Sequence, residues 1–192
     1  GIALLSLALA NPIFSFGNST NFSFNGPSAT VFILDDSYSM GTIINQKSYY
    51  ESAVETLLEI SHSISGESIY SIVLGSSPSR VLQDWTNITS KSKKLLDARQ
   101  PSERRTDIGP AIIQALHLLQ SVPQKIKRVY ILTDRDKNGW NEEEFSLIGE
   151  EAHYPINIID FSGMRQGVNR AAVEDTKVQQ EFLSNSRVIK VK

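Results

Sequence analysis

Short apolar runs alternate along the chain with longer segments whose apolar side chains recur at helical spacing. Residues 29–34 (ATVFIL) are apolar or small without interruption, which is typical of a strand buried on both faces. Further strands are predicted at residues 68–74, 80–85, 127–132 and 156–159. The run at residues 80–85 carries more polar side chains, and we expect it at an edge of the sheet.

Helices are predicted between these strands. In residues 48–64 an amphipathic pattern is formed by Tyr50, Val54, Leu57, Leu58 and Ser61. Three more helices are expected: a short basic one at residues 90–98, a strongly apolar one at 108–119 and an acid-rich one at 142–152. This alternation predicts an α/β fold, a doubly wound and mostly parallel sheet with helices on both faces. Such sheets bind ligands at the carboxyl ends of their strands.

The segments outside this pattern suggest a division of the chain. In residues 1–12 the stretch from residue 2 to residue 10 is apolar or small, Asn11-Pro12 ends it, and it is too short to span a membrane alone. They fit the end of a membrane helix, the core of a signal segment or a buried element of the domain. Residues 13–28 resemble a linker, residues 29–165 form the domain, and residues 166–192 form an extension with renewed strand-like alternation.

Composition narrows the classes of function. The hydrophobic fraction of 40% and charged fraction of 21% are those of a globular domain. The net charge is -2 and no basic stripe stands out, so nucleic acid is not an expected partner. The chain has no cysteine, which excludes disulfides, thiol catalysis and cysteine-based zinc sites.

Candidate chemistry begins directly after the first predicted strand, with the sequence DDSYSMG at residues 35–41. Asp35, Ser37 and Ser39 offer a carboxylate and two hydroxyls on one loop. These hard oxygen ligands suit Mg²⁺ or Mn²⁺ and suit zinc or copper poorly. The spacing alone is also common in helix-capping turns.

Two more candidate ligands lie at matching element ends. Thr106 precedes the apolar helix at residues 108–119, and Asp134 follows the strand at residues 127–132. Taken singly, Thr106 or Asp107 could cap a helix and Asp134 could form a turn. Together with the first loop they predict three hydroxyls and two carboxylates converging on one ion.

These three motifs (DDSYSM, RTDIG and the TD pair after a strand) resemble the metal-ion-dependent adhesion site of von Willebrand factor A domains. The resemblance covers about residues 29–162. It implies Ser37, Ser39 and Thr106 as direct or near-direct ligands, with Asp35 and Asp134 often acting through water. It also implies a bound Mg²⁺, with Mn²⁺ or Ca²⁺ as substitutes. Two carboxylates only just neutralise a divalent ion, so an open coordination position can take an acidic side chain of a partner protein, without catalysis.

The sequence departs from the family pattern at three cationic positions. Arg104 and Arg105 precede Thr106 where the family often has small residues, and Arg135 follows Asp134 where glycine is frequent. These departures bear on the choice of partner and on loop shape.

A closer resemblance is to the bacterial aerotolerance (BatA-like) family. It rests on an apolar LALANP segment, on LDDSYSM and on LTDRDKNGW with Trp140. That family implies N-terminal membrane helices, this domain outside the cytoplasmic membrane (periplasmic or extracellular) and then β-rich modules. The tail NRAAVEDTKV is similar to the start of such a module.

Other classes of function remain as alternatives. An aspartate closing the first strand is a nucleophile in haloacid-dehalogenase-type phosphatases, but the acid/base position two residues on is Ser37. A receiver domain would use Asp35 and Asp36, yet no strand ends in an evident phosphoacceptor. A scaffold without metal is the third alternative. No G-x-S-x-G, P-loop or G-x-G-x-x-G motif is present.

Overall fold

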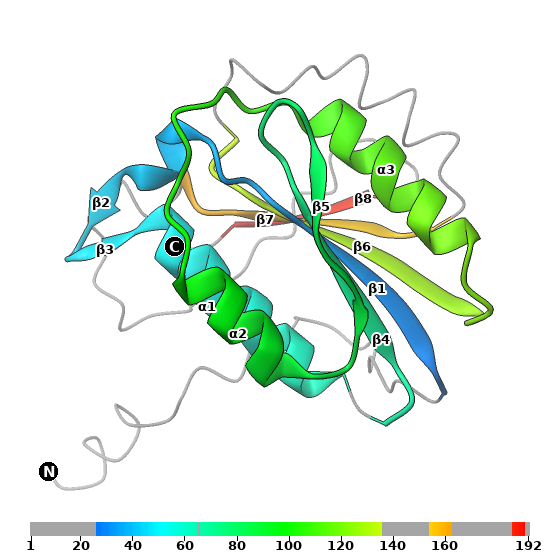
Figure 1. The fold of residues 1–192 in the computed structure, drawn as a ribbon. Coiled ribbons are helices and arrows are strands. Elements are labelled where there is room, and N and C mark those ends of the chain that lie inside the picture. Colours follow the sequence, from blue (N-terminus) through cyan, green and yellow to red (C-terminus); the bar gives the residue numbers. More distant parts are fainter. Residues whose placement is uncertain (1–25, 65, 136–153, 163–185, 191–192) are drawn as a thin grey trace, which may run out of the picture.

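The computed structural model describes residues 26–64, 66–135, 154–162 and 186–190 (Figure 1). Its centre is a six-stranded sheet in the order β5-β4-β1-β6-β7-β8. The strands are β1 (Ser28–Leu34), β4 (Ile69–Leu74), β5 (Arg80–Thr86), β6 (Ile126–Thr133), β7 (Ile156–Asp160) and β8 (Ser186–Lys190). The predicted α/β fold with a mostly parallel sheet is confirmed.

Strand order places the middle of the sheet at β1. All neighbouring strands are parallel except β5, which runs antiparallel to β4 at the edge. From β1 the chain moves to β4 on one side and later crosses to β6 on the other. This reversal separates the loops that leave β1 and β6, and such a switch point is the usual ligand position in open α/β sheets.

Helices cover both faces, as the alternation predicts. The helices α1 (Tyr49–Ser63) and α2 (Thr89–Asp97) lie together on one face, and α3 (Ile108–Gln120) lies on the other (Figure 1). A capping box starts α1: Ser48 Oγ accepts from the Glu51 amide at 3.1 Å, and Glu51 Oε2 accepts from the Ser48 amide at 2.7 Å.

Two apolar layers bury β1, one on each of its faces. Val31 and Ile33 pack in the layer under α3, whereas Phe32 and Leu34 pack in the layer under α1. Successive side chains of a strand point to opposite faces. Both faces of β1 are therefore buried, and its carboxyl end is fixed in position by the core.

Some elements were not predicted from the sequence. A hairpin of β2 (Ile43–Ile44) and β3 (Lys47–Ser48) follows a short 3-10 helix, η2 (Tyr38–Gly41). Asn45 and Gln46 form its turn with φ of 51° and 69°. Two-residue strands leave no periodic signal, because periodicity needs several repeats.

The ends of the chain fall only partly within the described residues. Residues 1–25, the helix expected at 142–152 and Trp140 lie outside them. The strand-like tail does form a strand, β8, which pairs in parallel with β7 and so extends the sheet of the domain itself. Ser28, placed in the linker by the sequence, is the first residue of β1. Among the helices in the described ranges, none has the length and apolar character needed to cross a membrane.

Candidate functional site

The two predicted carboxylates lie at the carboxyl edge of neighbouring strands. Asp35 directly follows β1, and Asp134 directly follows β6, the parallel partner of β1. Their relative exposures are 0% and 3%, respectively. Both carboxylates therefore sit at the switch point of the sheet and are almost completely removed from bulk solvent.

The Asp35 carboxylate connects the loops that leave these two strands. Its Oδ1 accepts from the Ser37 amide at 3.0 Å, and its Oδ2 accepts from Thr133 Oγ1 at 2.7 Å. Thr133 Oγ1 in turn accepts from the Arg135 amide at 3.0 Å. In the sequence Thr133 is only part of a TD pair, whereas in the structure its hydroxyl donates directly to the Asp35 carboxylate.

A continuous series of contacts joins the other predicted ligands. Thr106 Oγ1 donates to Ser37 Oγ at 2.8 Å, and Ser37 Oγ lies 3.2 Å from Ser39 Oγ. Ser39 Oγ donates to Asp134 Oδ1 at 3.2 Å. All five side chains singled out from the sequence are therefore brought together, although they come from three separate loops.

Backbone hydrogen bonds hold the loop of Thr106 against the other two. The amide of Tyr38 donates to the Arg104 carbonyl at 3.2 Å, and the amide of Ser77 donates to the Arg105 carbonyl at 3.0 Å. Thr106 also forms an isolated antiparallel bridge with Ser76, just beyond β4. The position of the Thr106 hydroxyl is thus fixed by main-chain contacts on both sides.

Gly75 makes a close approach of the strands possible. Its amide donates to the Leu34 carbonyl at 2.8 Å, and its carbonyl accepts from the Asp107 amide at 2.9 Å. A Cβ at this position would lie 2.8 Å from Ile108 Cδ1 and 3.4 Å from the Asp35 Cα. A larger side chain would press on the residues that position the site.

The second acidic residue of the loop, Asp36, takes no part in this cluster. It is completely buried; its Oδ1 accepts from the Ser76 amide at 3.2 Å and its Oδ2 lies 3.9 Å from the Arg99 Nη2. Its carbonyl accepts from both the amide and the hydroxyl of Ser102, at 2.6 and 2.9 Å. Asp36 therefore anchors the loop through its contacts with Ser76 and Ser102.

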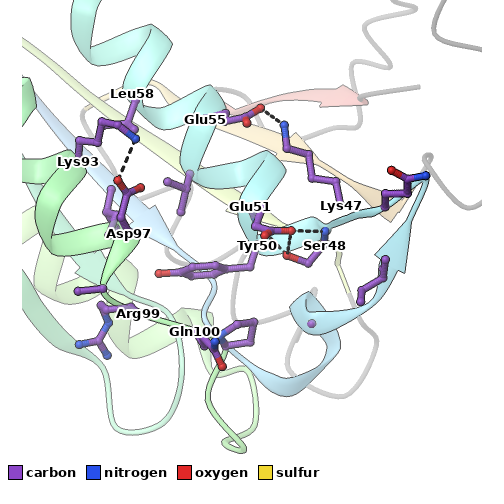
Figure 2. A pocket seen from close by; sticks show the side chains of 17 residues that line it. Lys47, Ser48, Tyr50, Glu51, Glu55, Leu58, Lys93, Asp97, Arg99 and Gln100 are labelled. Carbon is purple, nitrogen blue, oxygen red and sulfur yellow. Dashed lines mark hydrogen bonds and ion pairs between the residues drawn. The ribbon is translucent and has the colours of Figure 1, made fainter.

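Arg99 also borders a surface groove of about 880 Å³ between α1, the β2–β3 hairpin and the end of α2 (Figure 2). Figure 2 shows Tyr50 reaching from α1 toward the segment of Arg99. Burial raises the pKa of the Tyr50 hydroxyl to about 12, although the Arg99 charge opposes the rise. Two ion pairs, Lys47–Glu55 and Lys93–Asp97, lie along the groove. The groove carries cations and anions that pair with one another.

Burial also changes the acidity of the central carboxyl. It raises the pKa of Asp35 from the ordinary 3.8 to about 6, against the hydrogen bonds from Ser37 and Thr133, which lower it; the nearby Asp134 charge adds to the rise. The charged form of Asp35 is thus poorly compensated by the protein alone. A cation at this edge would supply the missing compensation.

The donor set is hydroxyl-rich. The described residues include no group of three or more His, Cys, Asp or Glu side chains arranged to hold a metal. His62 and His117 lie in the last turns of α1 and α3, away from this cluster, and His153 lies outside the described residues. Any ion here would be bound by hydroxyls and carboxylates, which is the ligand set of Mg²⁺ and similar hard cations.

Fold and site together define a doubly wound α/β domain with an oxygen-rich cluster at its switch point. The family model of the von Willebrand factor type A domain matches residues 30–137, more than half of the chain. The chain therefore belongs to the von Willebrand factor type A domain family. Domains of this family generally act as protein-interaction or adhesion modules.

Solved structures of bacterial proteins share the fold. BatB from Bacteroides thetaiotaomicron is 19% identical, with a TM-score of 0.59, covering 71% of this chain and 67% of its own. An aerotolerance-related membrane protein from Bacteroides fragilis is 17% identical, with a TM-score of 0.58, covering 70% and 67%. A von Willebrand factor type A protein from Catenulispora acidiphila is 16% identical, with a TM-score of 0.61, covering 71% and 33%. No curated protein matches the sequence.

Asp35→Asn should stabilise the domain in the absence of divalent ions. Because the pKa of Asp35 is raised to about 6, its stabilising contribution is complete below pH 3.8 and is lost as the pH rises through 6. The loss corresponds to at most about 3 kcal/mol at neutral pH. Urea unfolding in EDTA should show the variant to be more stable at about pH 7.5, with the difference shrinking toward about pH 4. A variant that is less stable than the wild type at neutral pH would contradict this account.

Arg99→Met should destabilise the protein by about 1–3 kcal/mol, because it leaves the buried Asp36 carboxylate without its cation. Asp36→Asn in the same background should recover much of that loss, since the amide oxygen still accepts from Ser76 and no charge remains. The measurement is a double-mutant cycle by urea unfolding. Additive effects of the two substitutions would show that the pair does not interact.

Proposed function

We propose that this domain binds one Mg²⁺ ion through Ser37, Ser39 and Thr106, with Asp35 and Asp134 completing the site through water. The ion then holds an acidic side chain of a partner protein. The protein acts as a metal-dependent interaction module, and Mn²⁺ or Ca²⁺ can replace Mg²⁺. No covalent chemistry is part of this function.

The spacing of the oxygen atoms carries the proposal. Ligands on neighbouring corners of an octahedron, each about 2.1 Å from Mg²⁺, are separated by about 3 Å. Among the three proposed direct ligands, the contact from Thr106 Oγ1 to Ser37 Oγ measures 2.8 Å and the contact from Ser37 Oγ to Ser39 Oγ measures 3.2 Å. These separations are also those of ordinary hydrogen bonds, and they are compatible with neighbouring positions in a magnesium coordination shell.

The charge balance between the ion and its protein ligands favours a site that binds a partner over a site whose ligands all come from this domain. The two carboxylates balance the two charges of the ion, and the three hydroxyls are neutral. Both oxygens of Asp35 already accept hydrogen bonds, from Ser37 and Thr133. These bonds support a role for Asp35 in orienting the loops and in holding a water molecule on the ion. An ion held mainly by neutral oxygens keeps a strong attraction for a further carboxylate, and the partner would supply it.

Two alternatives are less well supported. A phosphatase-like reaction of the haloacid-dehalogenase type would need an acidic acid/base group two residues after Asp35, whereas Ser37 holds that position. A scaffold without metal would have no evident reason to bury the charge of Asp35 at the edge of the sheet. Burying a charged group costs stability unless its surroundings compensate the charge.

We also propose that the domain is anchored to a membrane and works outside the cytoplasm. The support is indirect. One structural neighbour is described as an aerotolerance-related membrane protein. Residues 1–12 of this chain, which are apolar or small from residue 2 to residue 10, are the candidate for the end of an anchor.

Calorimetric titration of Mg²⁺ tests the ion site. We expect one site in the wild type and at least about a tenfold loss of affinity in Ser37→Ala, because a direct ligand is removed. Ser77→Ala is the matched control: this serine is exposed at the same edge of the sheet, and its backbone bond to Arg105 does not involve the side chain. Equal Mg²⁺ affinity in the wild type and Ser37→Ala would contradict the assigned ligands.

Partner capture tests the interaction. The immobilised chain should retain proteins from a native extract in Mg²⁺ and release them in EDTA, and the Ser37→Ala bait should retain none of these. The Ser77→Ala bait should behave as the wild type. Retention of the same proteins in EDTA as in Mg²⁺ would contradict the metal-dependent mechanism.

A further inference from the structure

The edge of the candidate metal site exposes one aromatic and two cationic side chains. Tyr38 stands between Ser37 and Ser39 in the chain, and 77% of it is exposed, while Met40 two residues later is completely buried. Arg104 and Arg105 are exposed and come directly before Thr106. We refer to Tyr38, Arg104 and Arg105 as the rim residues.

The backbone beneath the rim residues is held in place. Tyr38 donates its amide to the Arg104 carbonyl at 3.2 Å, which joins the two loops that carry the rim. The backbone carbonyl of Arg105 accepts a hydrogen bond from the Ser77 amide at 3.0 Å. A surface whose backbone is already ordered loses little conformational entropy on binding, so its side chains can contribute more to affinity.

The rim has the composition of a binding surface. Tyrosine and arginine are enriched among residues that dominate binding energy, and charged fork-shaped guanidinium groups recognise carboxylates in two-point contacts. A tyrosine exposed to this extent gains little from the packing of the domain. Glu103, which is also exposed, places one negative charge beside the two arginines.

We propose that the rim residues select a partner segment with two acidic residues close together in sequence. This inference rests on the proposed metal-dependent function. The first acidic side chain completes the coordination of the ion, and the second pairs with Arg104 or Arg105. The aliphatic part of the segment packs on the Tyr38 ring.

Geometry sets the spacing of the two acidic residues. Arg105 is adjacent in the chain to the ligand Thr106, and Arg104 is one residue further away. An extended peptide advances about 3.3 Å per residue, so side chains one to three positions apart are about 3–10 Å apart along it. An arginine side chain beside Thr106 can reach a carboxylate at that separation from the ion.

Selection from a phage-displayed library of random peptides tests this inference. The full chain is immobilised in Mg²⁺, and bound phage are eluted with EDTA. We expect the eluted peptides to be enriched in two Asp or Glu residues within three positions of each other. Two synthetic peptides then serve as probes for titration. The two-acid peptide is taken from this set, and the one-acid peptide is the same sequence with one Asp→Asn change.

The arginine variants should affect only the second acidic contact. Arg104→Gln with Arg105→Gln should weaken the two-acid peptide by about tenfold or more, the value of a charged hydrogen bond, and leave the one-acid peptide unchanged. Tyr38→Ala should weaken both peptides, and Glu103→Gln should strengthen the two-acid peptide. Lys91→Gln with Lys94→Gln removes the same charge from exposed positions on α2 and should change neither.

The outcomes distinguish this inference from the function on which it rests. Two results would overturn the role of the rim and leave the metal-dependent interaction standing. One is the selection of Mg²⁺-dependent peptides with single acidic residues, and the other is an affinity of the arginine variant for the two-acid peptide equal to that of the wild type. Peptides that bind equally in EDTA, or a selection without EDTA-eluted peptides, would overturn both.

Discussion

The hydrogen bonds of one buried carboxylate organise the functional edge of this domain. Asp35 leaves the central strand and accepts from Ser37 on its own loop and from Thr133 at the end of the neighbouring strand. These bonds fix two loops relative to each other, and burial raises the pKa of the carboxyl to about 6. The same arrangement that positions the hydroxyl ligands therefore leaves a negative charge that the protein compensates poorly, which is a reason for the site to attract a cation.

The sequence was sufficient to predict the positions of the five candidate ligands. Asp35 and Asp134 each follow an apolar run buried in the core, and parallel strands bring their carboxyl ends to one edge. Thr106 could be placed because it precedes a strongly apolar helix whose start must face the same edge. The sheet and the helices on both of its faces were predictable for the same reason, since long periodic segments dominate the core.

The contacts that hold the site could not be predicted in this way. Thr133 bonds to Asp35 across 98 positions, and Arg99 approaches Asp36 only because the segment after α2 returns toward the first loop. No pattern along the chain signals such pairs, because each depends on the conformations of two loops at once. The sequence singled out Asp35 as the candidate ligand, but nothing in it indicated that Asp36 anchors the loop through Ser76 and Arg99.

Anomalous diffraction from a crystal of the protein grown with Mn²⁺ tests the central claim most directly, because it locates the ion itself. We expect one strong peak about 2.1–2.3 Å from the hydroxyl oxygens of Ser37, Ser39 and Thr106, with water between the ion and Asp35. A fully occupied peak elsewhere, or none at this edge at saturating Mn²⁺, would show that these residues do not form the metal site.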